Sequence, residues 1–360
     1  MKLFRSRTIK NNLILKLFSI ILLCSIVLAA CTSTTSQSVI EDAENSKLDL
    51  DSGTEEERNV KETLKSEDLD KQYEASTDQD KSLKILSIGN SFSQDAHFWL
   101  NAISKNYRTK VKAYNLFIGG CSLERHAANL AMDKAKYTLE VNAMPEKKIS
   151  INAALKLEDE FDIITVQQVS QDAGLEETYE PFLTTLLEKI REAQPNAKIF
   201  FHETWAYDDD SNHGGFANYD RDRIKMFEAI KATSEKKASE HELGLIRVGE
   251  VVEALRSADV FATDKSAEVT YSPYQHEKIK YTEYDNDPNT RPSLTRDGFH
   301  LNLWYGRYAA ALTWYATLTG ERVSGNPYVP NAPQKYPANQ ELSDEEWEFI
   351  RNTVDEIVFG

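Results

Sequence analysis

Residues 84–93 read Lys-Ile-Leu-Ser-Ile-Gly-Asn-Ser-Phe-Ser. An apolar run that ends in a Gly-Asn-Ser turn and leads into an amphipathic segment predicts a strand followed by a helix. In open α/β folds such a turn lies at the carboxyl edge of the sheet, where these folds hold their ligands. The hydroxyl of Ser91 is therefore a candidate nucleophile.

A second block, Asp297-Gly-Phe-His300, lies about two hundred residues further along the chain. A serine hydroxyl is inert at neutral pH unless a base accepts its proton and a third group orients that base. An Asp three residues before a His offers both groups. Taken singly, Ser91 is equally a helix cap, His300 a surface histidine and Asp297 a turn residue. Their joint occurrence in this order favours catalysis.

The alternation of strand and helix recurs along the chain. We expect strands over 83–88, 111–118, 161–166, 197–201 and 243–248, and helices over 96–103, from about 123, over 179–193, 221–238 and 251–256. Strands that alternate with helices imply a parallel sheet covered by helices on both faces, an α/β fold of three layers. Gly320 is expected to end a helix that begins near Trp304, and Ser343 with Glu346 can cap a last helix over 344–358.

The N-terminal region has the layout of an export signal. Five basic residues precede the uncharged apolar run Leu17–Leu28, which is too short to span a bilayer stably. The run is followed by Ala-Ala-Cys31, which resembles the bacterial lipobox. We expect residues 1–30 to be removed and Cys31 to carry lipid; an ordinary signal peptide cut nearby is the alternative. Residues 31–81 are acidic and poor in aromatic residues, which favours a disordered tether.

Charge and cysteine content limit the possible partners. Much of the formal net charge of -16 lies in the tether, and no basic face for nucleic acid is expected. Cys24 leaves with the signal and Cys31 is modified, so Cys121 has no disulfide partner. Three of the other histidines, His126, His202 and His213, are not spaced with Asp or Glu as a metal set. We therefore expect no metal and no cofactor.

The two blocks resemble those of the SGNH/GDSL hydrolase superfamily, in which Gly-Asp-Ser supplies the catalytic serine and Asp-x-x-His supplies the catalytic aspartate and histidine. Here the first block reads Gly89-Asn-Ser-Phe92, with Asn in place of the usual Asp. Together with Glu203-Thr-Trp-Ala-Tyr207, this combination of motifs resembles a bacterial branch of the superfamily. The resemblance implies a five-stranded parallel, flavodoxin-like sheet, a hydrolase domain over 82–325, a C-terminal extension over 326–360 and a Ser-His-Asp acyl-enzyme mechanism.

A tetrahedral intermediate needs hydrogen-bond donors directed at its oxygen. The backbone N–H of Ser91 is one candidate, because it lies at a helix start where the dipole favours negative charge. Another is an N–H from Gly119-Gly120 after the second strand, which corresponds to the glycine block of the superfamily. A plain strand-to-helix turn uses glycine equally well.

A third donor is expected after the third strand. The superfamily usually has Gly-x-Asn-Asp there, but this chain reads Gln-Gln-Val-Ser-Gln-Asp over 167–172. Relatives that deacetylate sugars carry Gln-Gly-Glu-Ser-Asp, which matches the first and last positions of Gln168–Asp172. We expect Gln168 rather than Gln171 to supply the donor, and strand alternation places Gln167 on the opposite side.

The substrate side is expected at the end of the fourth strand. Trp205 and Tyr207 are predicted to stack on a sugar ring, with packing at the rim as an equal alternative, and Glu203 is predicted to bind a substrate hydroxyl. Residues 260–296 have no helical period and alternate Tyr with charges and Pro. We interpret this segment as a lid or substrate wall; a surface hairpin is the alternative.

These features together predict a serine esterase. We expect it to remove acetyl or another short acyl group from a carbohydrate or other small ester, at the outer side of the cell membrane. A lipase or thioesterase would need a broad apolar groove, whereas the predicted edge is rich in Tyr, Trp, Asn and Asp. A lipoprotein that binds glycan without catalysis is the alternative from a different functional class.

Overall fold

The computed structural model describes residues 82–258, 261, 293–331 and 342–360. The predicted export signal, the predicted lipidation site Cys31, the predicted tether and nearly all of the 260–296 segment lie outside the described residues. In the part of the chain that is described, no helix is long and apolar enough to cross a membrane.

Within these residues, seven strands form one sheet in the order β4-β3-β2-β1-β5-β6-β7. The bounds are β1 Ser82–Gly89, β2 Lys110–Phe117, β3 Tyr137–Val141, β4 Met144–Ile149, β5 Ile163–Val166, β6 Lys198–Glu203 and β7 Gly244–Arg247. The strands β2, β1, β5, β6 and β7 run parallel, in the flavodoxin-like order. The predicted parallel sheet is therefore confirmed, but the strand count is wrong, because an antiparallel hairpin, β3–β4, extends it.

Helices connect the strands and follow the last one. Their bounds are α3 Ser91–His97, α4 Leu100–Ser104, α5 Leu123–Ala131, α6 Ile151–Ala154, α7 Phe182–Ala193, α8 Arg223–Glu240, α9 Val248–Arg256, α10 Tyr305–Thr319 and α11 Asp344–Phe359. The single helix expected over 96–103 is instead the pair α3 and α4. Gly320 ends α10 in the left-handed conformation and Ser343 forms a capping box with Glu346, both as predicted.

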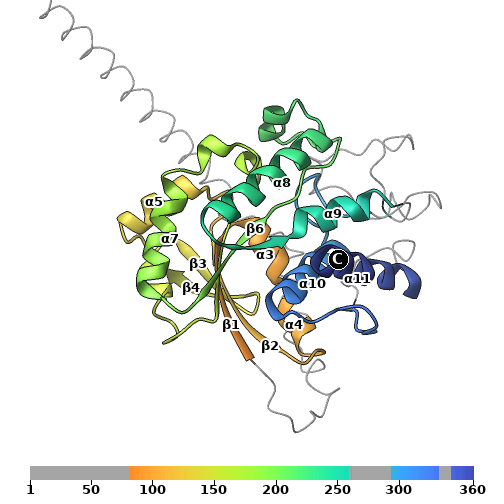
Figure 1. Cartoon of the computed structure of the whole chain (residues 1–360), viewed down its shortest axis with the longest axis horizontal. Coiled ribbons are helices and arrows are strands. Elements are labelled where there is room, and N and C mark those ends of the chain that lie inside the picture. Colours follow the sequence, from red (N-terminus) through yellow and green to blue (C-terminus); the bar gives the residue numbers. More distant parts are fainter. Residues whose placement is uncertain (1–81, 259–260, 262–292, 332–341) are drawn as a thin grey trace, which may run out of the picture. The chain divides into compact units, whose positions relative to one another are not determined.

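Side chains of the parallel strands enter two separate cores, because successive residues of a strand point to opposite faces. In β1, Ile85 packs into the core that contains α10, whereas Leu86 packs into the core that contains α5 and α7. Figure 1 shows α5 and α7 on one side of the sheet and α10 and α11 on the other. Trp347 of α11 lies in the same core as Ile85, so the helix of the predicted C-terminal extension is part of the domain core.

The hairpin β3–β4 gave little sequence signal. Its turn places Asn142 and Ala143 at positive φ, a geometry for which Asn-Gly is the usual sequence. β4 is mostly exposed, reads Met-Pro-Glu-Lys-Lys-Ile and lies at the edge of the sheet, where charged residues and Pro prevent pairing with other chains. Such a strand has no apolar alternation to reveal it.

Candidate active site

The turn after β1 is built to present Ser91. A Cβ on Gly89 would lie 2.3 Å from the hydroxyl oxygen of Ser93, so this position needs glycine. Asn90 is the N-cap of α3, and its side-chain oxygen accepts the N–H of Phe92 at 3.0 Å. Ser91 is thus the first residue of the helix, at the carboxyl edge of the sheet.

Residues 295–301, here named the His300 turn, hold the second block in a closed loop. The first and last residues of the turn pair through an isolated antiparallel bridge. Gly298 has φ +82°, a conformation that favours glycine. One carboxylate oxygen of Asp297 accepts the backbone N–H groups of Phe299 and His300, at 3.1 and 2.5 Å.

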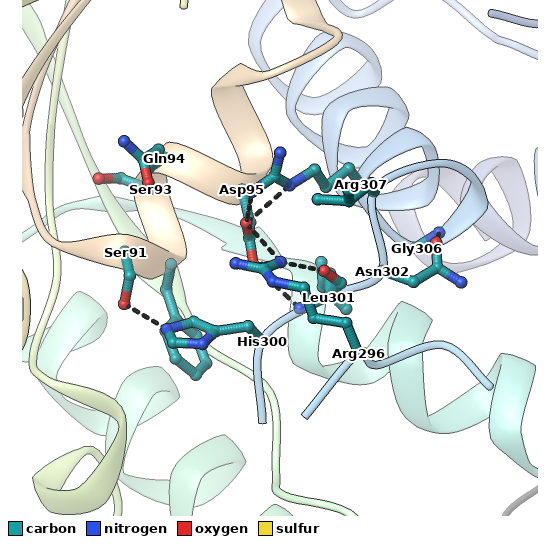
Figure 2. A network of polar contacts seen from close by, with 12 residues as sticks. Ser91, Ser93, Gln94, Asp95, Arg296, His300, Leu301, Asn302, Gly306 and Arg307 are labelled. Atoms are coloured by element: carbon teal, nitrogen blue, oxygen red, sulfur yellow. Dashed lines mark hydrogen bonds and ion pairs between the residues drawn. The ribbon is translucent and has the colours of Figure 1, made fainter. Parts of the chain in front are cut away.

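The structure brings the three predicted catalytic residues together. His300 Nε2 lies 2.9 Å from Ser91 Oγ, and His300 Nδ1 lies 2.6 Å from Asp297 Oδ2. Figure 2 shows His300 directed at Ser91 from the turn. Because a carboxylate only accepts, Nδ1 carries the proton and Nε2 is free to accept the serine proton. This is the arrangement that serine activation requires.

Asp297 remains ionised in this site. Burial alone would raise the pKa of its carboxyl, but the charge of His300, the hydrogen bonds from His300 and the charge of Arg296 hold the pKa well below its ordinary value. The side chains of His300 and Asp297 are 21% and 11% exposed. His300 is therefore reachable from solvent, whereas Asp297, which orients it, is largely buried.

The predicted backbone donors lie close to the nucleophile turn. The N–H of Ser91 is in the first turn of α3, where backbone donors have no partner within the helix. Asn90 Nδ2 donates to the carbonyl of Cys121 at 3.1 Å, which ties the turn after β1 to the turn after β2. Gly119 and Gly120, in that second turn, are exposed, and Gly120 has φ +57°. The side chain of Asn90 thus links the two turns that carry the predicted backbone donors.

Gln168 is placed differently from the prediction. Its amide nitrogen donates to the carbonyl and hydroxyl of Thr178, at 3.1 and 3.0 Å. Its amide oxygen accepts the N–H groups of Leu123 and Val169, both at 2.9 Å. The side chain is buried and fully hydrogen-bonded among these loops, so the assignment of Gln168 as an oxyanion donor is not supported.

The residue before it, Gln167, reaches the nucleophile turn instead. Its amide nitrogen donates to Asn90 Oδ1 at 2.7 Å, and its oxygen is 2.9 Å from His202 Nδ1. Gln167 therefore supports the cap of the nucleophile helix. Strand alternation had placed Gln167 on the side of the strand opposite to Gln168, and in the structure the amides of both residues are engaged in hydrogen bonds to neighbouring loops.

Trp205 packs beneath the triad and is not exposed to solvent. Its side chain is 0% exposed, its ring stacks on Phe92 with centroids 4.0 Å apart, and its Nε1 donates to the carbonyl of Phe299 at 2.6 Å. The prediction that Trp205 stacks on a substrate is thus wrong for this structure, because the His300 turn covers it. The ring is packed inside the domain and does not lie at its rim, as the alternative had it.

Glu203 and Tyr207 are likewise fully buried, so neither is in a position to bind a substrate. The hydroxyl of Tyr207 lies 2.8 Å from that of Ser170. Glu203 accepts the N–H of Glu250 in the first turn of α9 at 2.9 Å. Burial and the nearby charge of Glu250 raise the pKa of Glu203 to about 8.

Two partly exposed rings beside His300 were not predicted to belong to the site. Phe299 lies with its centroid 4.2 Å from His300, and His213 packs on Phe299 at 4.8 Å. His213 Nδ1 accepts the N–H of Gly215 at 3.1 Å, so in the neutral ring Nε2 carries the proton. Burial and the charge of His300 lower the pKa of His213. Phe299 lies inside the Asp-Gly-Phe-His block, which was the available signal for it.

A metal site does not emerge from the geometry. Across 82–258, 293–331 and 342–360, no three His, Cys, Asp or Glu side chains are grouped as metal ligands.

Comparisons with known proteins agree with the fold. A model of the family described as a domain of unknown function (DUF4886) matches residues 84–272 and 279–343. No curated protein matches the chain. The crystal structure of a DUF4886 family protein from Bacteroides uniformis is 29% identical, with a TM-score of 0.62, and the match covers 78% of this chain and 96% of that chain.

Two more distant solved structures come from enzymes of ester hydrolysis. A member of the lipolytic G-D-S-L family from Veillonella parvula is 15% identical, with a TM-score of 0.38, over 66% of this chain and 98% of that chain. A variant of an acetyl-xylooligosaccharide esterase from Geobacillus stearmophilus is 12% identical, with a TM-score of 0.36, over 69% of this chain and 97% of that chain.

Proposed function

We propose that this chain, which belongs to the DUF4886 family, is a serine esterase that hydrolyses short acyl esters, acetyl esters of carbohydrates above all. The single observation that carries the proposal is the continuous hydrogen-bonded line from Ser91 Oγ to His300 Nε2 and from His300 Nδ1 to Asp297. Residues that are far apart in sequence meet with the tautomer and distances that nucleophilic catalysis requires.

The reaction follows from these groups. Ser91 Oγ attacks the acyl carbon while its proton passes to His300 Nε2, and Asp297 stabilises the imidazolium that forms. The tetrahedral intermediate collapses with cleavage of the ester C–O bond, and the leaving alcohol takes the proton from His300. A water molecule then repeats the sequence on the acyl-enzyme, releasing the carboxylic acid and restoring Ser91.

The negative oxygen of the intermediate is assigned to backbone donors. The N–H of Ser91 and an N–H from Gly119 or Gly120 are on adjacent turns and cost no reorganisation during the reaction. We add Gln171 as the side-chain donor in place of Gln168. In the described part of the chain its amide has no hydrogen-bond partner, and its Cβ lies against Gly215, beside His213.

The surface of the described residues supports a small polar substrate over a lipid. Among those residues the large apolar side chains with high exposure are Met132, which follows α5, and Ile224, which lies in α8. Neither residue belongs to the His300 turn or to the turns after β1 and β2. Phe299 and the Nε2–H of His213 instead offer an aromatic ring and a donor beside the base, a combination suited to a sugar ring.

The location of the enzyme is a separate part of the proposal. Its support is the sequence layout alone: a basic segment, a short apolar run and Ala-Ala-Cys31, followed by an acidic tether. We propose that Cys31 is the lipid-modified first residue and anchors the esterase on the outer side of the membrane. Cys31→Ala should then move the protein from the membrane fraction to the soluble fraction, and retention in the membrane would refute the anchor.

Turnover of an aryl acetate, followed by acetate release from acetylated polysaccharides, tests the enzymatic proposal. Wild type should hydrolyse the aryl ester, Ser91→Ala should abolish turnover, and Ser343→Ala should leave it intact, because Ser343 only caps α11. If wild type and Ser91→Ala bind acetylated glycan equally and neither releases acetate, the chain is a glycan-binding protein and the proposed activity is wrong.

A further inference from the structure

On the basis of the proposed function, we propose that Asp95 is a positioning residue that fixes the His300 turn against the helix carrying Ser91. Asp95 lies one helical turn after Ser91 in α3, with its side chain 0% exposed. It belongs to neither sequence block. Its role would be to set the distance between the nucleophile and the base.

The contacts of Asp95 reach both ends of the second block. Oδ2 accepts the N–H of Leu301 at 2.9 Å, and Oδ1 accepts Nη1 of Arg296 at 3.1 Å. Arg296 directly precedes Asp297, and Leu301 directly follows His300. Figure 2 shows the carboxylate between these groups and Arg307. The carboxylate of Asp95 therefore binds the His300 turn both before Asp297 and after His300.

A third element, α10, also binds Asp95. Arg307 of α10 donates to Asp95 Oδ1 through Nε at 2.8 Å and through Nη2 at 2.7 Å, and its side chain is only 1% exposed. Burial alone would raise the pKa of Asp95, but the charges of Arg296, Arg307 and His300 hold it below its ordinary value. The carboxylate therefore stays ionised and keeps all of its donors.

The His300 turn is closed by its own hydrogen bonds, so its placement as a unit depends on contacts with other elements. Arg296 N–H donates to the carbonyl of His300 at 2.9 Å, across the turn. On the β6 side the N–H of Asp208 donates to the carbonyl of Gly298 at 2.8 Å. On the α3 side the turn is held by Asp95, in addition to the Ser91–His300 contact itself. Loss of the Asp95 contact should displace the whole turn from Ser91 while leaving its internal geometry unchanged.

A small displacement is enough to impair proton transfer. A general base works within about 2.6–3.2 Å of the atom that gives up its proton. An error of about 1 Å costs roughly a hundredfold in rate. Asp95 is therefore expected to affect kcat through the Ser91–His300 separation and to leave KM nearly unchanged, because it touches no substrate.

The test compares folded variants on an aryl acetate. Asp95→Asn should lower kcat about a hundredfold with KM within about twofold of wild type. Arg296→Gln should lower kcat in the same sense, and Arg296→Lys should recover part of it. The matched control is Asp355→Asn. Asp355 is also a buried carboxylate that accepts backbone N–H groups, but its partners follow α10 instead of the His300 turn. It should lose stability and keep kcat.

The inference is overturned if folded Asp95→Asn keeps kcat within about threefold of wild type, or if KM rises while kcat holds. Should Asp95→Asn not fold, the same criteria apply to Arg296→Gln, whose side chain is 21% exposed. A crystal structure of the variant gives a readout that does not depend on activity. Ser91 Oγ and His300 Nε2 should separate beyond about 3.5 Å, outside hydrogen-bond range, and an unchanged separation refutes the role. If wild type itself lacks turnover, the proposed esterase activity is wrong. The Ser91 Oγ–His300 Nε2 distance in the variant structure still tests whether Asp95 positions the His300 turn.

Discussion

The ends of β1 and β6 carry the most distinctive sequence patterns of the chain, and the structure uses them in opposite ways. At the end of β1, Ser91 is partly exposed and meets His300. At the end of β6, Trp205 and Tyr207 are fully buried. Both ends lie at the same edge of the sheet. Position at the carboxyl edge therefore does not by itself predict contact with a substrate.

The difference comes from what lies on top of each strand end. The His300 turn rests on Trp205, which donates to the carbonyl of Phe299 and stacks on Phe92. The turn thereby covers the β6 end and reaches Ser91 at the β1 end. Aromatic residues that follow a strand can thus support the site from below. The residues that face solvent are then those of the turn that covers them.

The largest effect expected is on the β1 side. Asp297→Asn should lower kcat on an aryl acetate by about 10³ to 10⁴, because an amide in place of the carboxylate fails to hold the reactive tautomer of His300. Thermal unfolding should change little by comparison. Asp209→Asn is the control, since its ion pair with Arg223 is exposed on the aspartate side. Loss of less than tenfold in kcat for folded Asp297→Asn would remove Asp297 from the triad.

The next largest effect is expected on the β6 side, in stability. Trp205→Ala should lower the free energy of unfolding by about 3–5 kcal/mol, as removal of a large buried aromatic side chain does. Trp205→Phe should lose less, because it keeps most of the packing and removes only the N–H to Phe299. Denaturant unfolding measures both. A variant that keeps its stability but shows a raised KM would place Trp205 in the substrate site and erase the contrast between the two strand ends.

A third comparison separates the two glutamines after β5. Gln171→Ala should lower kcat by roughly a hundredfold if its amide stabilises the intermediate. Gln168→Ala should instead lower the free energy of unfolding by about 1–3 kcal/mol, because it leaves buried N–H groups of Leu123 and Val169 without an acceptor. Steady-state kinetics and unfolding of the two variants decide this. The reverse pattern would return the oxyanion role to Gln168.

The smallest effect concerns Glu203 and pH. Its pKa in the folded state is raised to about 8 from the ordinary 4.5, so the folded chain binds more protons than the unfolded chain between these values. Stability should therefore fall as pH rises through that window, by about 2 kcal/mol between pH 6 and 8. Glu203→Gln should remove that part of the slope. An unchanged slope would show that Glu203 is ionised in the fold.

The sequence predicted the parallel strands, the order of the triad and the caps of α10 and α11, because each rests on a local pattern with a physical cause. It missed β4, whose charged residues and Pro145 hide an edge strand. It also missed Asp95, because a lone Asp inside a short helix has no pattern until the fold brings Arg307 and Arg296 to it. Burial of Trp205 was equally hidden, since it depends on a turn about ninety residues away.

The most direct test of the central role of Ser91 is covalent labelling with a fluorophosphonate, read by mass spectrometry of the digested protein. Such a reagent needs an activated serine hydroxyl, and in the proposed mechanism His300 activates Ser91. The proposed mechanism predicts one phosphonyl group, on the peptide that contains Ser91, and none on Ser91→Ala or His300→Ala. An unlabelled wild type, or a label on another serine, would contradict it.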